Sequence, residues 1–431
     1  GYLESALKDN KSWDKIFAEI ILAKDTKEEN PAIVYYRSRI NDLDKLTNSV
    51  SVSFFGVNIS CAQCHDHPLA FEWTQGHFFG MKSFFGRMFQ NGKRIGERDY
   101  GDVPYKDPEG ASYTADVMFL TGAKAHEPPW WNPSDAVKKT EREQLEAQKK
   151  EDVPPAEPAF SRRAQLVRTA LADENRHYFS RSMVNHTWRR LMGRGIVSPV
   201  DQMHPANEAS HPELLAELAE RFADDGYHLP ALIKAIVLSD TYARSSVWNL
   251  ATTDNPDTDA DAGKGVGADA GRPTADYFAV GQIRVLTPMQ YGGSIMLAAT
   301  SPERFRGEDG SQVADSVARG GDFIAKQLQY PGDNFQIGVR EALFFSNSEE
   351  VQNRVLRTSG DSLVKQLVDR SAADQHAAVQ TAFKNTLCRL PDAEELAAAQ
   401  AYLGSRQDRT ESAWQQLVWA LILSSEFRFN H

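Results

Sequence analysis

Apolar residues recur along most of this chain at the three- and four-residue spacing that places side chains on one face of an α-helix. Near the start of the chain this spacing joins Trp13, Ile16, Phe17, Ile20 and Ile21. The same spacing predicts further helices over about 38–60, 74–89, 161–174, 177–195, 210–226, 229–246, 287–300, 359–388, 392–405 and 411–431. The pattern predicts a mostly α, multi-helix protein.

Signals for helix ends accompany the spacing in the second half of the chain. Ser210 is predicted as an N-cap, Pro212 lies in the first turn, and Glu213 is the acidic partner of a capping box. Gly226 is predicted to stop this helix, and Gly193 ends the preceding one. These signals support helices over 177–195 and 210–226.

The length of 431 residues is too great for one ordinary core, so we predict two domains. Residues 91–125 contain glycine and proline punctuation, which indicates loops with a small β-hairpin. Residues 126–158 have prolines at both ends of a charged helix-forming middle, which is typical of a linker. We therefore predict a helical domain at 1–125, a charged proline-rich linker at 126–158 and a second helical domain at 159–431.

Residues 248–274 are rich in Asp, Gly and Ala and are predicted to form a disordered loop. Asp257, Asp259 and Asp261 alternate there in a pattern that faintly resembles a calcium-binding loop. Ala268 stands where such a loop requires a glutamate, so calcium binding is left open.

Charge and hydropathy exclude some classes of partner. The net charge of −11 argues against broad binding to nucleic acid, which needs a basic surface. The longest apolar runs fall far short of the roughly 20 residues that span a membrane, so no membrane span is predicted. The chain begins at Gly1 without an initiator methionine or a signal pattern, and we expect residues upstream of it.

The stretch 61–65 reads C-A-Q-C-H, the spacing of a c-type haem attachment site. Thiols three positions apart, at Cys61 and Cys64, lie on one face of a turn and can add to the two vinyl groups of one porphyrin. The histidine that follows, His65, then points its imidazole at the iron from the proximal side. The motif predicts one covalent haem c, with iron bound through His65.

Other uses of the cysteine pair stay open on the motif alone. A thioredoxin-like pair would need a βαβ context, whereas this segment is predicted to be helical. Cys61, Cys64 and His67 could bind zinc, and the two thiols could also form a disulfide or stay free. The third cysteine, Cys388, is predicted to be a buried inert thiol on the apolar side of a helix.

The stretch SVSFFGVNISCAQCHDHPLAFEWTQGHFFGMKSFF, residues 51–85, resembles the cytochrome-like domain of planctomycete-type surface cytochromes. Members share a C-A-x-C-H-D-H-P core, a Trp-Thr/Ser-Gln helix start and a Phe-Phe ending. Residues 175–246 and the closing segment are similar to the helical domain of unknown function that follows in this family. His77 and Met81 depart from the family pattern. The resemblance implies an exported haem protein.

Residues beside the haem motif are assigned supporting roles. Asp66 is predicted to support an imidazole N–H, and His67 to order the turn, because two residues of chain cannot carry His67 to the opposite haem face. The distal ligand is open, and a vacant site is one alternative. Its candidates are His77, Met81 and Met88 in the first domain and His204 and His211 in the second, with a slight preference for His211.

The predicted function is one-electron transfer, or a haem-dependent redox step, at the cell surface or in the periplasm. The redox partner cannot be named. The alternative is a surface-assembly or scaffold protein, with homo-oligomers conceivable, in which the haem or cysteine pair is structural. The sequence shows no nucleophile elbow, P-loop, dinucleotide fingerprint or H-E-x-x-H motif. An electron-transfer protein is therefore favoured over a catalyst, although enzymatic activity stays open.

Overall fold

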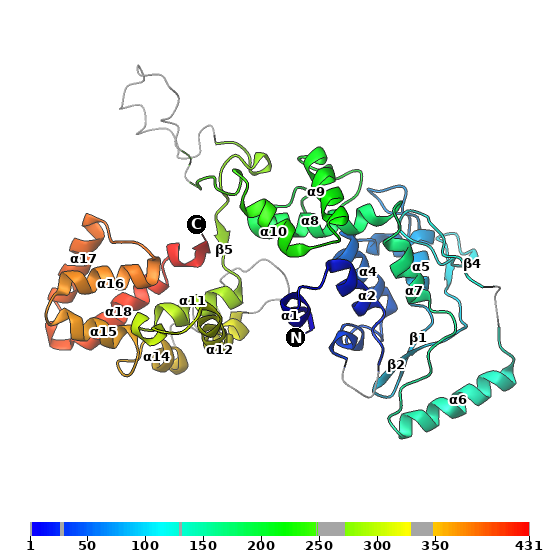
Figure 1. The fold of residues 1–431 in the computed structure, drawn as a ribbon, viewed down its shortest axis with the longest axis horizontal. Helices are drawn as coiled ribbons and strands as arrows, with labels where there is room; N and C mark the ends of the chain where they lie inside the picture. The colour runs from blue at the N-terminus through cyan, green and yellow to red at the C-terminus, as the bar shows by residue number, and fades with distance from the viewer. Residues whose placement is uncertain are drawn as a thin grey trace, which may run out of the picture. The chain divides into compact units, whose positions relative to one another are not determined.

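The computed structural model describes residues 2–25, 30–128, 132–246, 248, 272–328 and 348–430. The chain divides into two compact units, residues 1–282 (unit 1) and 283–431 (unit 2). Helices dominate both units and strands are few and short, so the predicted mostly α class is confirmed (Figure 1).

Unit 1 contains ten α-helices within its described residues: α1 (Tyr2–Lys8), α2 (Trp13–Ile21), α3 (Val34–Arg37), α4 (Leu43–Phe55), α5 (Gln75–Ser83), α6 (Asp135–Lys150), α7 (Arg162–Ala170), α8 (Arg176–Met192), α9 (Pro212–Asp224) and α10 (Leu229–Val237). Short 3₁₀ turns are η1 (Pro31–Ile33), η2 (Ser60–Gln63) and η5 (Ala275–Tyr277). Two antiparallel hairpins complete it: β1 (Met88–Asn91) with β2 (Arg94–Glu97), and β3 (Pro104–Lys106) with β4 (Ser112–Thr114).

Local rules account for some helix ends in unit 1 and fail at the start of α9. The Asp42 carboxylate accepts from the Lys45 N–H at the start of α4, and Gly193 ends α8 in a left-handed conformation, as predicted. The prediction that Ser210 is the N-cap of α9 is wrong. The N-cap is His211, because the Ser210 hydroxyl instead donates to the Ile196 carbonyl.

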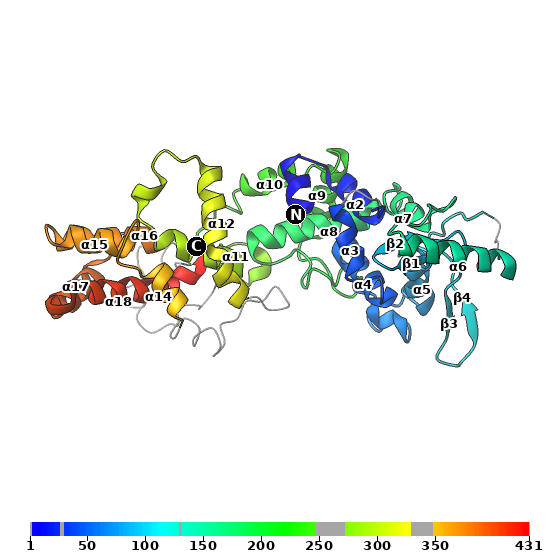
Figure 2. The ribbon, with the colours of Figure 1, turned by 90° about the horizontal axis from the view of Figure 1, so that it is seen from below.

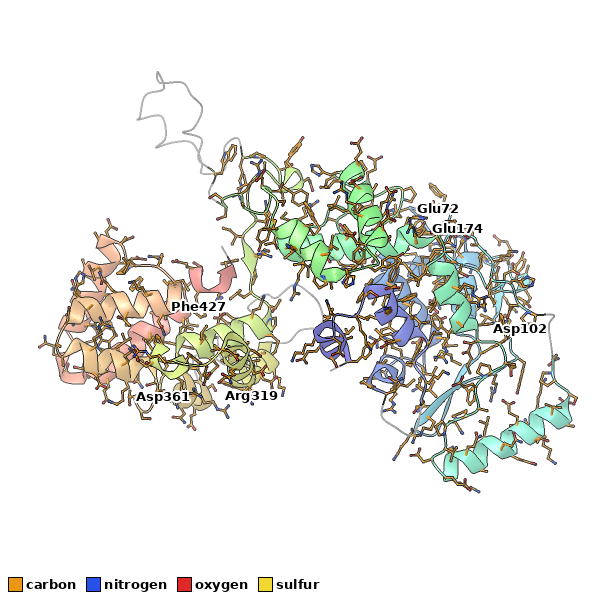
Figure 3. All side chains as sticks on the ribbon, viewed as in Figure 1. Glu72, Asp102, Glu174, Arg319, Asp361 and Phe427 are labelled. Carbon is orange, nitrogen blue, oxygen red and sulfur yellow. The ribbon has the colours of Figure 1, made fainter. Side chains whose placement is uncertain are left out.

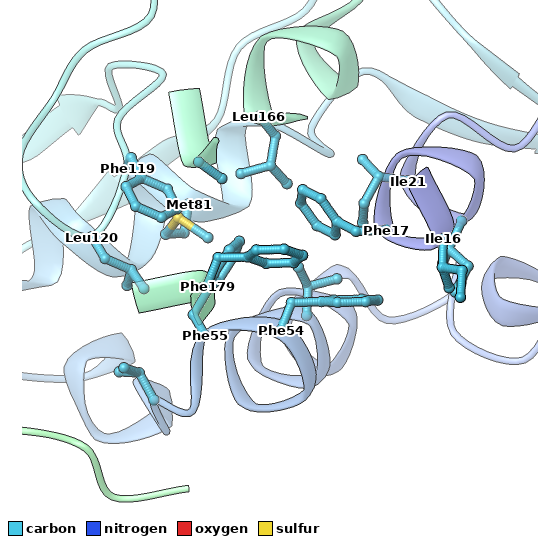
Figure 4. Packing of buried hydrophobic residues seen from close by; sticks show 14 of the residues in the cluster. Ile16, Phe17, Ile21, Phe54, Phe55, Met81, Phe119, Leu120, Leu166 and Phe179 are labelled. Carbon is cyan, nitrogen blue, oxygen red and sulfur yellow. The ribbon is translucent and has the colours of Figure 1, made fainter. Parts of the chain in front are cut away.

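The core of unit 1 combines aliphatic side chains with a group of aromatic rings (Figure 4). Phe17 of α2 lies 4.9 Å from Phe54 of α4 and 5.0 Å from Phe179 of α8, measured between ring centroids. Phe55 lies 5.0 Å from Phe119 in an edge-to-face arrangement. Full burial of rings like these stabilises a fold by about 1.5–3 kcal/mol each.

This core combines helices that precede and follow the predicted linker, since Phe179 and Leu166 pack with Phe17 and Phe55. A buried ion pair adds to the connection, with the Arg163 Nε 2.9 Å from the Glu97 Oε2. Arg163 also donates to the Ile21 and Ala23 carbonyls after α2. The division into domains at 1–125 and 159–431, with a linker at 126–158, stays a prediction.

Residues 91–158 of unit 1 contain some regular secondary structure. The β3–β4 hairpin projects from the helices (Figure 2), within the region predicted to be loops with a small hairpin. Helix α6 has no buried residue and lies beside the β1–β2 hairpin, where the Asn91 amide donates to the Leu145 carbonyl. It is a solvated helix, consistent with its charged sequence.

Unit 2 is a second helical body. Its described elements are β5 (Arg284–Val285), α11 (Pro288–Ala298), η6 (Pro302–Phe305), α12 (Gly310–Leu328), α14 (Glu349–Val355), α15 (Leu363–Ser371), α16 (Gln375–Leu387), α17 (Ala393–Gly404), η7 (Gln407–Arg409), α18 (Thr410–Ile422), η8 (Glu426–Arg428) and β6 (Phe429–Asn430). Its core includes Tyr291, Leu363 and Trp414. The prediction of a buried Cys388 is wrong: the residue caps α16 in a left-handed conformation and is exposed.

Two further sequence predictions concern the aspartate-rich loop and membrane-spanning helices. The aspartate-rich loop, with its calcium-like pattern at Asp257, Asp259 and Asp261, lies outside the described residues, apart from 248 and 272–274. Within the described part of the chain, no helix combines the length and apolarity needed to cross a membrane.

Candidate haem-attachment site

The C-A-Q-C-H stretch lies between α4 and α5, on the 3₁₀ turn η2 and its C-cap, Cys64. A 3₁₀ helix has three residues per turn, so side chains at i and i+3 eclipse each other and Cys61 and Cys64 face the same side. Both thiols are free and exposed, whereas Ala62 between them is fully buried. The turn is therefore anchored through Ala62 and presents its thiols outward.

Neighbouring elements hold this turn in place. Before it, the Asn58 N–H donates to the Asp201 carbonyl at 2.8 Å. Within it, the Gln63 side-chain amide donates to the Asp44 carboxylate of α4 at 2.9 Å, and the Gln75 side-chain amide donates to the Gln63 carbonyl at 3.1 Å. Contacts from three separate segments fix the turn before any ligand binds.

His65 is exposed, and its Nδ1 lies 2.7 Å from the Asp66 carbonyl oxygen. A carbonyl can only accept, so this contact places the proton on Nδ1 and leaves the Nε2 lone pair available. Iron-binding histidines have this arrangement, in which a hydrogen bond on one nitrogen orients the other. The Asp66 carboxylate instead accepts from the Gln75 N–H at 3.1 Å, so Asp66 supports the imidazole through its backbone.

His67 has a different environment, with only 3% of its surface exposed. Its Nδ1 accepts from the N–H groups of Leu69 and Ala70 at 3.3 and 3.0 Å, and its ring packs edge-to-face on Trp73. Burial lowers the pKa of His67 below its ordinary value, so the neutral ring is favoured. These contacts are those of a residue that orders the turn.

The zinc alternative gains no support from this geometry. Among the described residues, no group of three or more His, Cys, Asp or Glu side chains is positioned to hold a metal ion. The Nδ1 of His67 already accepts two backbone hydrogen bonds, so this nitrogen is not available as a third metal ligand beside the thiols.

Exposed apolar side chains follow the C-x-x-C-H motif in the sequence. Leu69 is 55% exposed and Phe71 is 82% exposed, values that are unusual for such large apolar side chains. Their neighbour Glu72 is also at the surface of unit 1 (Figure 3). A porphyrin has two large apolar faces, so exposed apolar side chains that closely follow the C-x-x-C-H motif in the sequence are compatible with its attachment.

The candidate distal ligands occupy separate places in unit 1. Met81 is fully buried in the aromatic core beside Phe119 (Figure 4). His77 belongs to the first turn of α5, where its Nδ1 accepts from the Thr74 N–H at 3.3 Å. His211 is the N-cap of α9, with its Nδ1 3.1 Å from the Ser210 hydroxyl. The distal assignment stays a prediction.

A second group of side chains, His177, Arg181 and His204, borders a cavity, and His204 contacts His67. The His204 ring is 5.6 Å from the His67 ring, measured between centroids, and borders a cavity with His177 and Arg181 of α8. From the sequence, His204 is predicted only as a candidate iron ligand, and no role is predicted for His177 or Arg181. Their signal is the i, i+4 spacing, which places His177 and Arg181 on one face of a helix.

An exposed C-x-x-C-H turn carried by a helical unit is the arrangement expected of a cytochrome-like domain. Residues 1–90 match the family model PSCyt2, described as a protein of unknown function (DUF1549), and residues 162–264 match PSD1, described as a protein of unknown function (DUF1553). The chain thus carries the domain pair associated with planctomycete-type cytochromes, and the resemblance is confirmed. The closing segment, predicted to resemble the end of the second domain, lies outside both matches.

Neither the search of curated proteins nor that of solved structures finds a match.

Proposed function

We propose that Cys61 and Cys64 hold one haem c through two thioether bonds, with His65 as the proximal ligand. The protein then acts as an exported one-electron carrier, or in a haem-dependent redox step, at the cell surface or in the periplasm. The observation that carries this proposal is the exposed turn in which the Asp66 carbonyl holds His65 Nδ1 and leaves Nε2 for a metal. The presence of a PSCyt2 domain, named as cytochrome-like, supports it.

Bound haem would supply an iron that cycles between two oxidation states one electron apart. The chain supplies orientation and electrostatics. The Asp66 carbonyl fixes the tautomer of His65 and raises its basicity as a ligand. Leu69 and Phe71, four and six positions after His65, are exposed apolar side chains available to an apolar ligand. Because η2 is anchored by Gln63, little rearrangement of the turn is needed.

The alternative function is that of a surface-assembly protein in which the haem or the cysteine pair is structural. The observation favouring it is a group of exposed apolar side chains on α10 and at its C-terminal end. Leu238 is 73% exposed, and Ile233 and Val237 are also exposed. Such surface often marks a protein contact. A covalent haem with reversible one-electron chemistry separates the two functions.

The test is production of the full chain in a host with haem-attachment machinery, followed by denaturing mass spectrometry and a pyridine haemochrome spectrum. We expect a mass increase of one haem and a spectrum typical of two thioether bonds. Replacing Cys61 and Cys64 with Ser should abolish attachment. The matched control is Cys388→Ser, which removes the remaining exposed thiol and should leave attachment intact. An unmodified mass in the wild-type protein, or zinc released by a chelator, would contradict the proposal.

A second measurement distinguishes the carrier from the scaffold. Protein-film voltammetry of the haem-loaded chain should give a reversible one-electron wave if the protein carries electrons. A haem that is attached but not reversibly reduced would favour the structural role.

A further inference from the structure

A cavity of about 360 Å³ lies in unit 1, between α8, the turn at 203–209 and the first turns of α9. Cavities that bind small molecules begin at about this size. Its lining has an apolar part, which includes Val197, Met203 and Leu215, and a polar part, which includes His177, Arg181 and His204. An apolar wall with a few convergent polar groups is the usual composition of a ligand site.

His204 forms a rigid part of the cavity wall. The residue is 8% exposed, and a tight turn fixes its position, since the His204 N–H donates to the Gln202 carbonyl and its own carbonyl accepts from the Asn207 N–H. Its Nδ1 has almost no accessible surface, so this nitrogen lies inside the wall and does not face the cavity. The ring therefore shapes the cavity without donating to or accepting from a ligand through Nδ1.

Arg181 is the group in this lining that points to a charged ligand. It is half-buried on α8, and no ion pair links it to a carboxylate in the part of the chain that the structure describes. His177, one turn earlier on the same helix face, has its pKa lowered by burial and by the charge of Arg181. This shift favours the neutral form of His177, and Arg181 supplies the positive charge of the lining.

Glu208 lines the same cavity and is exposed, so it adds one negative charge close to solvent. Together Arg181 and Glu208 bring the lining close to neutrality, which disfavours ligands with several negative charges. A single carboxylate matches the planar guanidinium of Arg181, which can donate two parallel hydrogen bonds to it.

We propose that this cavity binds a small organic acid with one carboxylate and an apolar body. The carboxylate pairs with Arg181. The apolar body lies against Val197, Met203 and Leu215. The lining of this cavity does not include Cys61, Cys64 or His65. The proposal therefore goes beyond the proposed haem function and is tested independently of it.

The experiment is ligand-observed ¹⁹F NMR on the full chain, with 4-fluorobenzoate as the probe and the neutral isostere 4-fluorobenzamide as its control. We expect saturable binding of the benzoate and binding at least about tenfold weaker for the benzamide, because the charge-assisted contact is lost. Arg181→Gln should weaken benzoate binding by a similar factor. Arg168→Gln, at an exposed position on α7, should leave it unchanged.

His204→Phe is a second control. Phenylalanine keeps a ring in the cavity wall and removes a buried unpaired nitrogen, so thermal stability should be maintained or raised and benzoate binding should stay within about twofold of wild type. Absence of saturable binding, equal affinity for benzoate and benzamide, or affinity unchanged in Arg181→Gln would overturn the proposal. None of these results would affect haem attachment at Cys61 and Cys64.

Discussion

The C-x-x-C-H turn at 61–65 and the loop at 67–73 are adjacent in the chain but have opposite environments. In the turn, both thiols and the His65 ring are exposed. In the loop, His67 and Trp73 are buried and hydrogen-bonded, and the His67 N–H donates to the Trp73 carbonyl at 2.8 Å. One segment presents reactive groups and the other fixes the chain that carries them.

The two histidines of this region show how environment decides role. His65 donates its Nδ1 proton to a carbonyl and keeps Nε2 available, whereas His67 uses Nδ1 to accept two backbone N–H groups. The same side chain is thus a candidate ligand at one position and a structural acceptor two positions later. Substitutions that affect cofactor and stability separately test this division.

The largest expected effect is spectroscopic. In the haem-loaded protein, His65→Ala should remove the proximal ligand, shift the Soret band strongly and allow carbon monoxide to bind, while both thioether bonds persist by mass spectrometry. His67→Ala should leave the Soret band near its wild-type position at temperatures where the protein is folded. Equal spectral shifts in the two variants would show that the roles of the two imidazoles are wrongly assigned.

The next largest effect concerns stability. Trp73 is almost fully buried and its Nε1–H donates to the Leu120 carbonyl at 3.2 Å. Trp73→Ala should lower the free energy of unfolding of the apoprotein by about 3–5 kcal/mol. The measurement is hydrogen exchange of peptides from unit 1, because a chain of two units need not unfold in one step. The matched control is Phe71→Ala, at 82% exposure, which should change stability by less than about 0.5 kcal/mol.

Much of this comparison could be predicted from the sequence, because its signals are local. Apolar spacing located α2 and its buried residues Ile16, Phe17, Ile20 and Ile21. The motif located the cysteine pair, and the separation of only two residues between His65 and His67 predicted that His67 orders the turn and does not reach the opposite haem face. Local spacing also explains why Gly193 was correctly predicted to end α8.

Two of the failures of prediction come from contacts between distant segments, and one comes from a helix end. Ser210 has the right chemistry for an N-cap, but the Ile196 carbonyl takes its hydroxyl proton. Cys388 follows an apolar pattern, yet α16 ends there in a left-handed conformation that leaves the thiol in solvent. The approach of His204 to His67 joins positions far apart in the chain, and no periodicity reports such a pairing.

A smaller stability effect is expected at His67 itself. His67→Ala removes the acceptor for the N–H groups of Leu69 and Ala70, which should cost about 1–3 kcal/mol where those groups stay buried. His67→Asn should recover part of this loss, because the asparagine side-chain oxygen can replace Nδ1 as the acceptor. The same hydrogen-exchange measurement tests both variants. Asparagine and alanine variants of equal stability would show that the acceptor role is unimportant.

The smallest expected effect is a pH dependence at His77, the third histidine of the region. Burial lowers the pKa of His77, and the nearby carboxylates of Glu72 and Asp66 only partly offset this. The folded protein therefore binds fewer protons than the unfolded chain below about pH 6.5, the ordinary histidine pKa. The contribution of neutral His77 to stability is complete above that pH and is lost as the pH falls below it, by less than about 1.4 kcal/mol per pH unit.

His77→Gln tests this pH dependence without removing the helix cap. Glutamine at the third position of α5 can form a capping box with Thr74, as His77 does through its Nδ1, so stability at pH 8 should stay within about 0.5 kcal/mol of wild type. Between pH 6.5 and 5 the variant should lose less stability than the wild-type protein, because one depressed titration is gone. His77→Ala should share this weaker pH dependence but start from a lower stability at pH 8, since the cap is lost. Parallel stability curves for wild type and His77→Gln would show that His77 does not contribute to the acid sensitivity of unit 1.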